Sequence, residues 1–542
     1  HITMSEEFTD FVKLCHDATS GLTSFDVVIR WLLDKKKLYK DLLLSEGPIH
    51  FLLKFKAPIE VLRTLLHVAP QLPYIEFSDG RTVLHLAACS SVSVEIMEYL
   101  LEVNFVAMNR QDSLGNLPVH CAVKHFAPYE VISSLMNHRR THPGFTTVVN
   151  NSLQTLVHIA CSSNPSVIDK IRGRFYDKEP LMMKDNNGNL PLHIACSNFL
   201  FAQVEPGSYM VRRFIRCYRE ALQIPNNDGN LPLHMACKTN QRKGTIQPLL
   251  DTKSHEYAFP DAAMVKNKDG KLPLHLACEV NANIFIIESL LSCYPEAALV
   301  QDNDGNLPIH LYCIHNHSAL CVKKVEKLLV SNPGTLCVQN HDRKFPSCYF
   351  DVASGEKYFT KAKEAIIKGL SVYLVQLLLM EFKDTSMIYK DSEGNTLLHL
   401  ACMKSVAEVS IATIAYLVDY CPVSCNSVNK DGKMPKDLLK PAASYKDKAG
   451  RLLLHRLLAT RNVHWMYTVD LTESVINFFA DAYPNSITVP DNNDMLPFHH
   501  ACLSDWCMTN DLFVLLRRYP DSLKSTPNMV GVVPESKKKK LN

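Results

Sequence analysis

The amino-acid sequence predicts an all-α fold, an α-solenoid of about thirteen stacked helix-turn-helix units joined by hairpin turns. Three observations predict it. One phrase of residues returns along most of the chain, its first copies are 35 to 41 residues apart, and each copy opens a short apolar segment of helical character. A fixed period of this length is typical of repeat arrays, because each unit buries its apolar surface only against its neighbours.

The repeated phrase is clearest in the middle of the chain. Residues 185–196 read Asp-Asn-Asn-Gly-Asn-Leu-Pro-Leu-His-Ile-Ala-Cys, and close copies follow at 227–237, 268–278 and 302–310. The glycine after Asn or Asp supplies the positive φ that a tight hairpin turn requires. The proline suits the first turn of a helix, where no amide donor is needed. The turn glycines of these copies are Gly188, Gly229, Gly270 and Gly305.

The histidine of the phrase is predicted to be structural. Because it recurs in one fixed context, we expect its ring to hydrogen-bond to the backbone near the start of the helix and not to take part in catalysis. The clearest copies are His193, His234, His275 and His310. Seven cysteines follow a motif histidine by three residues, and we interpret them as small buried hydrophobes at helix contacts.

These residues resemble the ankyrin family, whose signature is Thr-Pro-Leu-His-x-Ala. Leucine usually takes the place of the threonine, while Thr82, Thr155 and Thr396 occur in copies that lack the proline. The resemblance covers roughly residues 46–536. It implies protein–protein recognition through a concave face made of hairpin tips and first helices.

The domain organisation predicted from the repeats has three parts. Residues 1–45 lack the motif and are expected to form an N-terminal helical cap, with residues 1–3 interpreted as a cloning remnant before Met4. Residues 46–440 are expected to form a long array, and 441–542 a short second array with a basic tail. The spacing of 18 residues between Asp437 and His455 is too short for a whole unit and indicates a break near 440–446. A polar insertion in one hairpin is the alternative.

Composition and charge exclude several classes of function. With 58 basic and 55 acidic residues the net charge is +3, which provides no broad field for nucleic acid. No uninterrupted apolar run is long enough for membrane insertion. The 18 cysteines lack disulfide-framework spacing, so we expect reduced thiols and a cytoplasmic location, with the nucleus as an alternative. The usual enzyme signatures are missing, and we expect neither catalysis nor a cofactor.

One cluster has residue types that suit zinc, namely Cys313, His315, His317 and Cys321. Its spacing does not match a standard finger, and Cys313 already belongs to the repeat. The sequence therefore predicts no metal site. If the protein instead binds zinc or a ligand, or is an enzyme, this cluster is the candidate site.

The binding surface is predicted at the hairpin tips, where the ankyrin resemblance places partner contacts. These candidates are Asn187, Asn189, Asp228, Asn230, Lys268, Lys271, Asn303 and Asn306. Phe199 and Phe201, in a longer loop after a first helix, are candidate aromatic anchors. Plain turn chemistry and packing under the loop are the alternatives. The hypothesis that follows is a scaffold or adaptor for a protein partner, and the alternative is a structural subunit of a large assembly.

The repeat pattern generates a first test. We expect a far-UV circular dichroism spectrum dominated by helix, because each unit contributes two helices and only a short hairpin turn. A spectrum of mainly β character would contradict the predicted fold.

Overall fold

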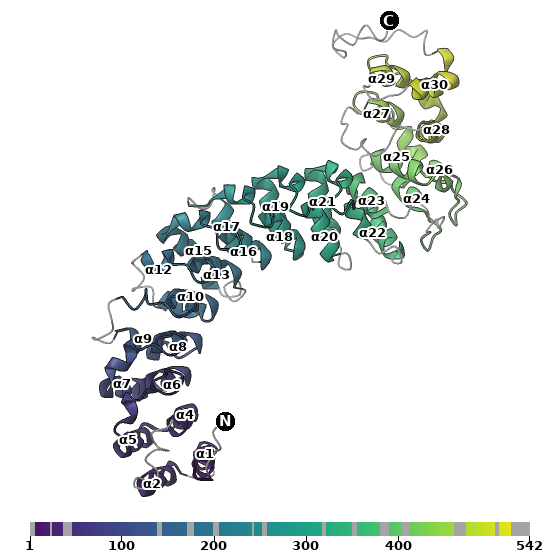
Figure 1. The fold of residues 1–542 in the computed structure, drawn as a ribbon. Coiled ribbons are helices and arrows are strands. Elements are labelled where there is room, and N and C mark those ends of the chain that lie inside the picture. Colours follow the sequence, from purple (N-terminus) through teal and green to yellow (C-terminus); the bar gives the residue numbers. More distant parts are fainter. Residues whose placement is uncertain are drawn as a thin grey trace. The chain divides into compact units, whose positions relative to one another are not determined.

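Helices make up the ordered elements of this chain, and no strand occurs in the residues that the structure describes. The computed structural model describes residues 6–21, 24–35, 46–137, 144–170, 178–198, 205–240, 243–251, 257–316, 321–349, 355–379, 390–403, 411–459, 473–503 and 509–521. The chain divides into two compact units, His1–Asp269 and Gly270–Asn542. Each unit is a stack of helix pairs, as the sequence predicts, so the all-α solenoid is confirmed (Figure 1).

In the first unit, the first helices of successive repeats pack in one row (Figure 1). They are α4 (Glu46–Lys54), α6 (Val83–Cys89), α8 (Pro118–Lys124), α10 (Leu156–Ser162), α13 (Pro191–Ser197) and α16 (Pro232–Lys238). The second helices are α5 (Ile59–Val68), α7 (Val94–Val103), α9 (Tyr129–Asn137), α11 (Pro165–Lys170), α15 (Glu205–Cys217) and α17 (Lys243–Leu250). Short helical turns lead to the hairpins: η1 (Leu72–Tyr74), η2 (Phe105–Asn109), α12 (Glu179–Met182), η4 (Arg219–Gln223) and η5 (Pro260–Met264).

Two further helices precede the first repeat. The structure has α1 (Glu6–Thr19) and α2 (Phe25–Lys35) where the sequence predicts a helical cap. Helix α1 packs on α4 and α2 packs on α5, so the pair stacks as a repeat does. Phe11 is fully buried and its ring lies 5.1 Å from that of Trp31. This pair covers the apolar edge that the first repeat would otherwise expose to water.

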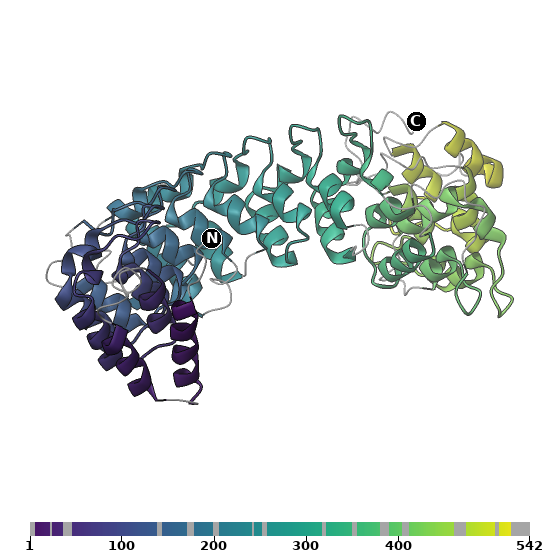
Figure 2. The same ribbon diagram turned by 60° about the horizontal axis from the view of Figure 1, so that its bottom comes forward.

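The second unit repeats the arrangement. Its first helices are α18 (Pro273–Glu279), α20 (Pro308–Asn316), α22 (Gly355–Ile367), α24 (Leu397–Cys402), α26 (Pro435–Ala443), α27 (Leu453–Ala459) and α29 (Pro497–Leu503). Its second helices are α19 (Ile284–Cys293), α21 (Val322–Ser331), α23 (Val372–Leu379), α25 (Ile411–Tyr420), α28 (Glu473–Ala482) and α30 (Thr509–Arg518). The short turns are η6 (Pro295–Leu299), η8 (Pro333–Cys337), η9 (Pro346–Tyr349), η12 (Pro422–Asn426) and η14 (Pro484–Ile487). Connecting turns project beyond the helix pairs (Figure 2).

Two places in the second unit depart from the regular pattern. The weak motif copy at Cys348 forms only η9, and α22 then supplies the first helix of that repeat. Helix α26 is followed by a turn and by α27, without a second helix between them. A Cβ added to Gly432 would meet none of the described residues within 4 Å, whereas one added to Gly394 would lie 3.2 Å from the amide nitrogen of Lys430. The break near 440–446 stays a prediction. It is supported by Gly432, because no described residue of a following hairpin lies as close to it as Lys430 lies to Gly394.

The core of each stack is made of small residues on the first helices and aliphatic residues on the second. In α13, Ala195 and Cys196 are fully buried, which allows neighbouring first helices to approach closely. Burial raises the pKa of the Cys196 thiol and of the equivalent Cys237. The other motif cysteines, Cys161, Cys278, Cys313 and Cys402, are also buried, while Cys502 is half-buried.

The motif histidine joins consecutive repeats. The amide of Leu190 donates to Nδ1 of His193 at 3.1 Å, so this nitrogen must be the unprotonated one. Its Nε2 therefore carries the proton and donates to the carbonyl of Asn230, in the next hairpin, at 3.0 Å. We call this pair of bonds the histidine clamp. In described repeats the outer bond is made by His85, His158, His193, His275, His310, His399 and His455.

Threonine adds a bond to the clamp where it precedes the first helix. The hydroxyls of Thr82, Thr155 and Thr396 lie 3.0, 2.8 and 2.8 Å from Nδ1 of the histidine three residues later. Repeats with leucine at this position keep the backbone bond to Nδ1 and lose only the hydroxyl. The fold therefore does not depend on the threonine.

The clamp generates a prediction on acid stability. Burial lowers the pKa of His193 from 6.5 to about 4, because the charged imidazolium would lose its hydration inside the helix stack. The unfolded chain therefore binds more protons than the folded chain below pH 6.5. We expect the unfolding free energy to be constant above that pH and to fall as the pH drops towards 4. The loss is about 3 kcal/mol for a shift of this size.

The matched control is His193→Gln. A glutamine amide accepts and donates as the neutral ring does but does not titrate. Urea unfolding of both proteins between pH 7 and pH 4 should show a shallower decline for the variant. Equal slopes would contradict the histidine's role in the acid sensitivity.

Candidate partner-binding surface

In most of the described hairpins, an Asp or Asn side chain caps its own turn. Oδ1 of Asp185 accepts from the amides of Asn187 and Asn189 at 2.9 and 2.8 Å. Gly188 closes the turn with a φ of 72°, a value that side chains rarely adopt. The recurrence of Asn and Asp at the tips is therefore explained first by turn chemistry, because these side chains cap their own turns.

Consecutive tips are also joined through their backbones. The amide of Asn227 donates to the carbonyl of Asn187 at 2.9 Å, and that of Lys268 donates to the carbonyl of Asp228 at 3.0 Å. A Cβ on Gly188 would lie 2.8 Å from the Asn227 amide nitrogen. The turn glycine is thus required twice, by its conformation and by the approach of the next tip.

A second connection runs through side-chain amides. Nδ2 of Asn226 donates to Oδ1 of Asn189 at 2.9 Å, and Asn267 and Asn340 do the same to Asn230 and Asn306 at 3.0 and 2.8 Å. Asn230 and Asn306 are buried, with 5% and 7% of their surface exposed. Three of the candidate binding residues thus hold the repeats together. Burial leaves the side chains of Asn230 and Asn306 little surface for a partner.

Four other candidates lie on the surface. Asn187, Asp228, Lys268 and Asn303 are exposed at their tips. Lys271 is half-buried, and its ammonium group lies 3.0 Å from the carboxylate of Glu279. Their part in binding stays a prediction, and Phe199 and Phe201 lie outside the described residues.

The zinc candidate is not assembled by the described residues. The thiol of Cys313 is buried in the helix stack and burial raises its pKa, which disfavours the thiolate that zinc requires. His315 is exposed, and its Nε2 lies 3.9 Å from the carboxylate of Glu279. Cys321 is half-buried, and His317 lies outside the described residues. Among the described side chains no group of three or more His, Cys, Asp or Glu is placed to hold a metal ion.

The structure shows an apolar surface that sequence reasoning missed. Leu114 and Phe126 are about 60% exposed, and Leu153 is 47% exposed. Leu114 sits at a tip where the clearest copies have Asn or Asp, and Leu153 replaces the turn glycine with a φ of 56°. Phe126 follows α8 with a φ of 58°. The sequence does contain a sign of this surface, because Leu114 and Leu153 are apolar at repeat positions where the clearest copies have Asn, Asp or Gly. We call these three residues the apolar tip surface.

The two repeats that carry Leu114 and Leu153 are also joined irregularly. His120 is buried, the Leu117 amide donates to its Nδ1, and its Nε2 has no hydrogen-bond partner among the described residues. The outer bond of the clamp is therefore missing in the repeat whose next hairpin carries Leu153. A cavity of about 150 Å³ lies beside it, lined by Leu114, Asn150 and Ile159 among others.

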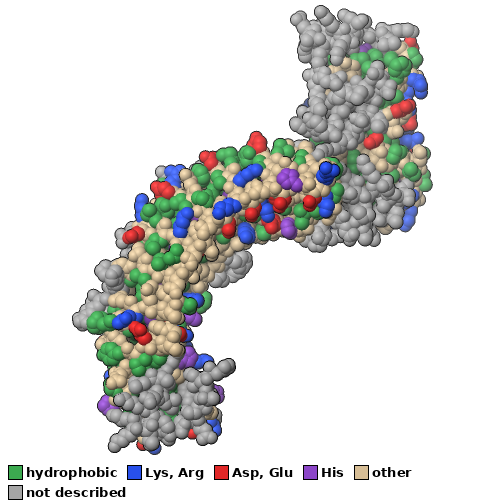
Figure 3. Space-filling model, in the orientation of Figure 1, with side chains coloured by type: hydrophobic (Ala, Val, Ile, Leu, Met, Phe, Trp, Pro, Cys, Tyr) green, Lys and Arg blue, Asp and Glu red, His purple; other side chains and the backbone are tan. Residues whose placement is uncertain are grey.

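The charges on the surface are mixed. On the face in Figure 3, Lys and Arg alternate with Asp and Glu, and the coloured residues form no large patch of one sign. No helix in the described ranges is both long enough and apolar enough to cross a membrane.

Stacked helix pairs with joined hairpin tips define a helical repeat protein. Residues 49–147 match the family model for ankyrin repeats, in three copies. The chain therefore contains ankyrin repeats, as the motif predicts, and such repeats are generally protein–protein interaction modules. A comparison with curated proteins finds no match.

The tips generate a test that separates backbone strain from contact. Gly188 and Gly432 have φ values of 72° and 71°, but only Gly188 has the next tip within 3 Å of an added Cβ. Gly432→Ala should destabilise by about 1–2 kcal/mol, the cost of the left-handed conformation. Gly188→Ala should cost more, because the next tip must also move. Urea midpoints measure both, and equal losses would show that the tip contact contributes nothing.

Proposed function

We propose that this protein is an adaptor that binds a protein partner across its hairpin tips and first helices, with the apolar tip surface as the anchor. The observation that carries the proposal is Leu153, a bulky side chain at a φ of 56° in the place of a turn glycine. Such a residue costs about 1–3 kcal/mol in the folded chain. Strain of this kind concentrates at functional sites, where the side chain repays it by another contact.

Exposure and position support the same reading. Leu114 and Leu153 lie on consecutive tips, whose backbones are joined by the 2.9 Å bond from the Asn151 amide to the Leu114 carbonyl. Phe126 lies at the other end of α8, in the loop after the first helix. A partner that covers α8 and α10 would thus meet an apolar residue at both ends of the first helices. A few side chains that become fully buried on binding carry most of the energy of a protein interface, and we propose these three for that part.

The mixed charge of the surface favours a partner held by apolar and hydrogen-bonding contacts over one steered by charge. The exposed tips at Asn187, Asp228 and Lys268 extend the proposed surface along the first unit.

The test uses Leu114→Asp combined with Leu153→Asn in the full chain. Asparagine adopts the left-handed conformation more readily than leucine, so the melting temperature should not fall. Partners captured from a native lysate by the wild type should be lost or weakened at least tenfold, as quantified by mass spectrometry. Leu299→Asp is the control, because Leu299 is 42% exposed but lies in η6, away from the tips. Unchanged capture by the double variant, or equal loss in the control, would contradict the proposal.

A further inference from the structure

A second kind of bridge joins consecutive hairpins, and it starts at the residue nine positions before the motif histidine. Nε2 of Gln111 donates to the carbonyls of Gly115 and Val149 at 2.8 and 2.9 Å. Nε2 of Gln301 donates to the carbonyls of Gly305 and Gln339 at 2.8 and 3.2 Å. In both repeats one primary amide thus joins two carbonyls. One belongs to the turn glycine of its own hairpin, and the other to the residue at the equivalent position of the next hairpin. We call this starting residue the bridge position.

Lysine makes a simpler version of the bridge. The ammonium groups of Lys184, Lys390 and Lys446 donate to carbonyls at the bridge position of the following hairpin, at 3.1, 3.1 and 3.5 Å. The groove between hairpins therefore accepts an aliphatic stem that ends in an N–H donor. Only the primary amide, with two hydrogens on one nitrogen, makes both bonds in these repeats.

Proline occupies the bridge position at Pro225 and at Pro490, and it has no side-chain donor. A cavity of about 320 Å³ lies at Pro225, a volume within the range of small-ligand pockets. Pro225, Gly229 and Lys266 line it, and these are the three positions that a glutamine bridge would connect. The cavity therefore lies where Gln111 and Gln301 place their own side chains in other repeats.

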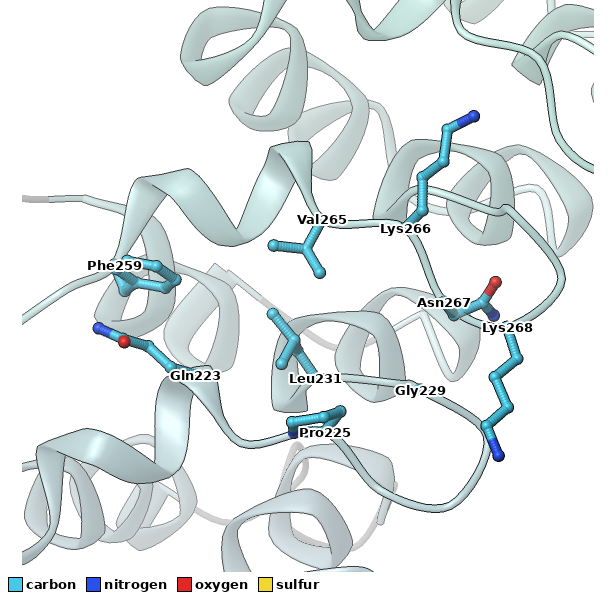
Figure 4. A pocket seen from close by; sticks show the side chains of 9 residues that line it. All are labelled: Gln223, Pro225, Gly229, Leu231, Phe259, Val265, Lys266, Asn267 and Lys268. Carbon is cyan, nitrogen blue, oxygen red and sulfur yellow. The ribbon is translucent and has the colours of Figure 1, made fainter.

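The walls of this cavity suit the stem of a side chain. Figure 4 shows Val265 and Leu231 facing one another across it, with Phe259 on one side and Pro225 below. Lys266 and Lys268 extend away from it and place positive charge outside. Gln223 at the end of η4 and Phe259 just before η5 also line it. The short turns η4 and η5 thus contribute to its lining, and it shares no residue with the apolar tip surface.

We propose that this cavity is a binding site for a glutamine side chain of an extended partner peptide. The carboxamide donates to the carbonyls of Gly229 and Lys266, as Gln111 and Gln301 donate in their own repeats. A carbonyl oxygen has two lone pairs, so each can accept such a bond in addition to any that it already has. The two external lysines disfavour a lysine or arginine in the same place, and the aliphatic stem packs on Leu231 and Val265.

The first experiment tests the chemistry on the unaltered protein. The full chain with labelled Leu and Val methyl groups is titrated with N-acetyl-glutamine N-methylamide and followed by methyl NMR. We expect saturable shifts of the Leu231 and Val265 methyl signals. N-acetyl-glutamate N-methylamide has nearly the same shape, but a carboxylate replaces the side-chain N–H donors, so it should bind at least tenfold more weakly. No shift with the glutamine probe, or equal binding of the glutamate probe, would overturn the proposal.

The second experiment fills the site from within. Pro225→Gln supplies the missing bridge and should abolish the shifts, while Pro225→Ala cannot reach the two carbonyls and should preserve them. Circular dichroism checks that both variants fold. Probe binding that survives Pro225→Gln would place the probe elsewhere and overturn the assignment. Neither result decides whether the apolar tip surface binds a partner, because the two sites share no residue.

Discussion

A neutral imidazole held between two backbone groups is the interaction on which these stacks depend. Nδ1 of the motif histidine fixes the start of its own helix, and Nε2 fixes the following hairpin, as His193 does between Leu190 and Asn230. The position of each hairpin then sets the tip contacts and the side-chain amide bonds that lie beyond it. Because every bond of this kind joins neighbours only, the structure grows by adding repeats without requiring one large core.

This mode of construction decides which residues are available for recognition. Most Asn and Asp side chains at the tips already bond to their own turn or to the next one, as Asp185 and Asn189 do. A residue that matches the repeat pattern and makes the standard contact is explained by its role in the fold. The candidates for function are the departures, where a side chain at a standard position does not make the standard contact. Leu153 and Pro225 are departures of this kind, and they lie at different positions of different hairpins.

The sequence predicted the fold well because periodicity reports which residues recur. The turn glycines, the proline at the start of α13 and the buried motif cysteines all follow from the repeated phrase. Periodicity does not report which neighbour a residue contacts. The repeated phrase therefore predicts Asn230 and Asn306 as partner-binding residues, whereas their side-chain oxygens accept hydrogen bonds from the next repeat. The cavity at Pro225 depends on the register between two hairpins, and only the structure provides that register.

The buried cysteines of the first helices give the array a set of internal reporters. The thiols of Cys161, Cys196 and Cys237 lie fully buried in consecutive repeats, and burial raises their pKa values. An alkylating reagent reacts with a thiolate that it can reach, so each of these sites reacts only while its own repeat is open. The rate of modification at each cysteine thus measures how often the repeat around it opens. Compared along the chain, those rates would show where the solenoid separates first.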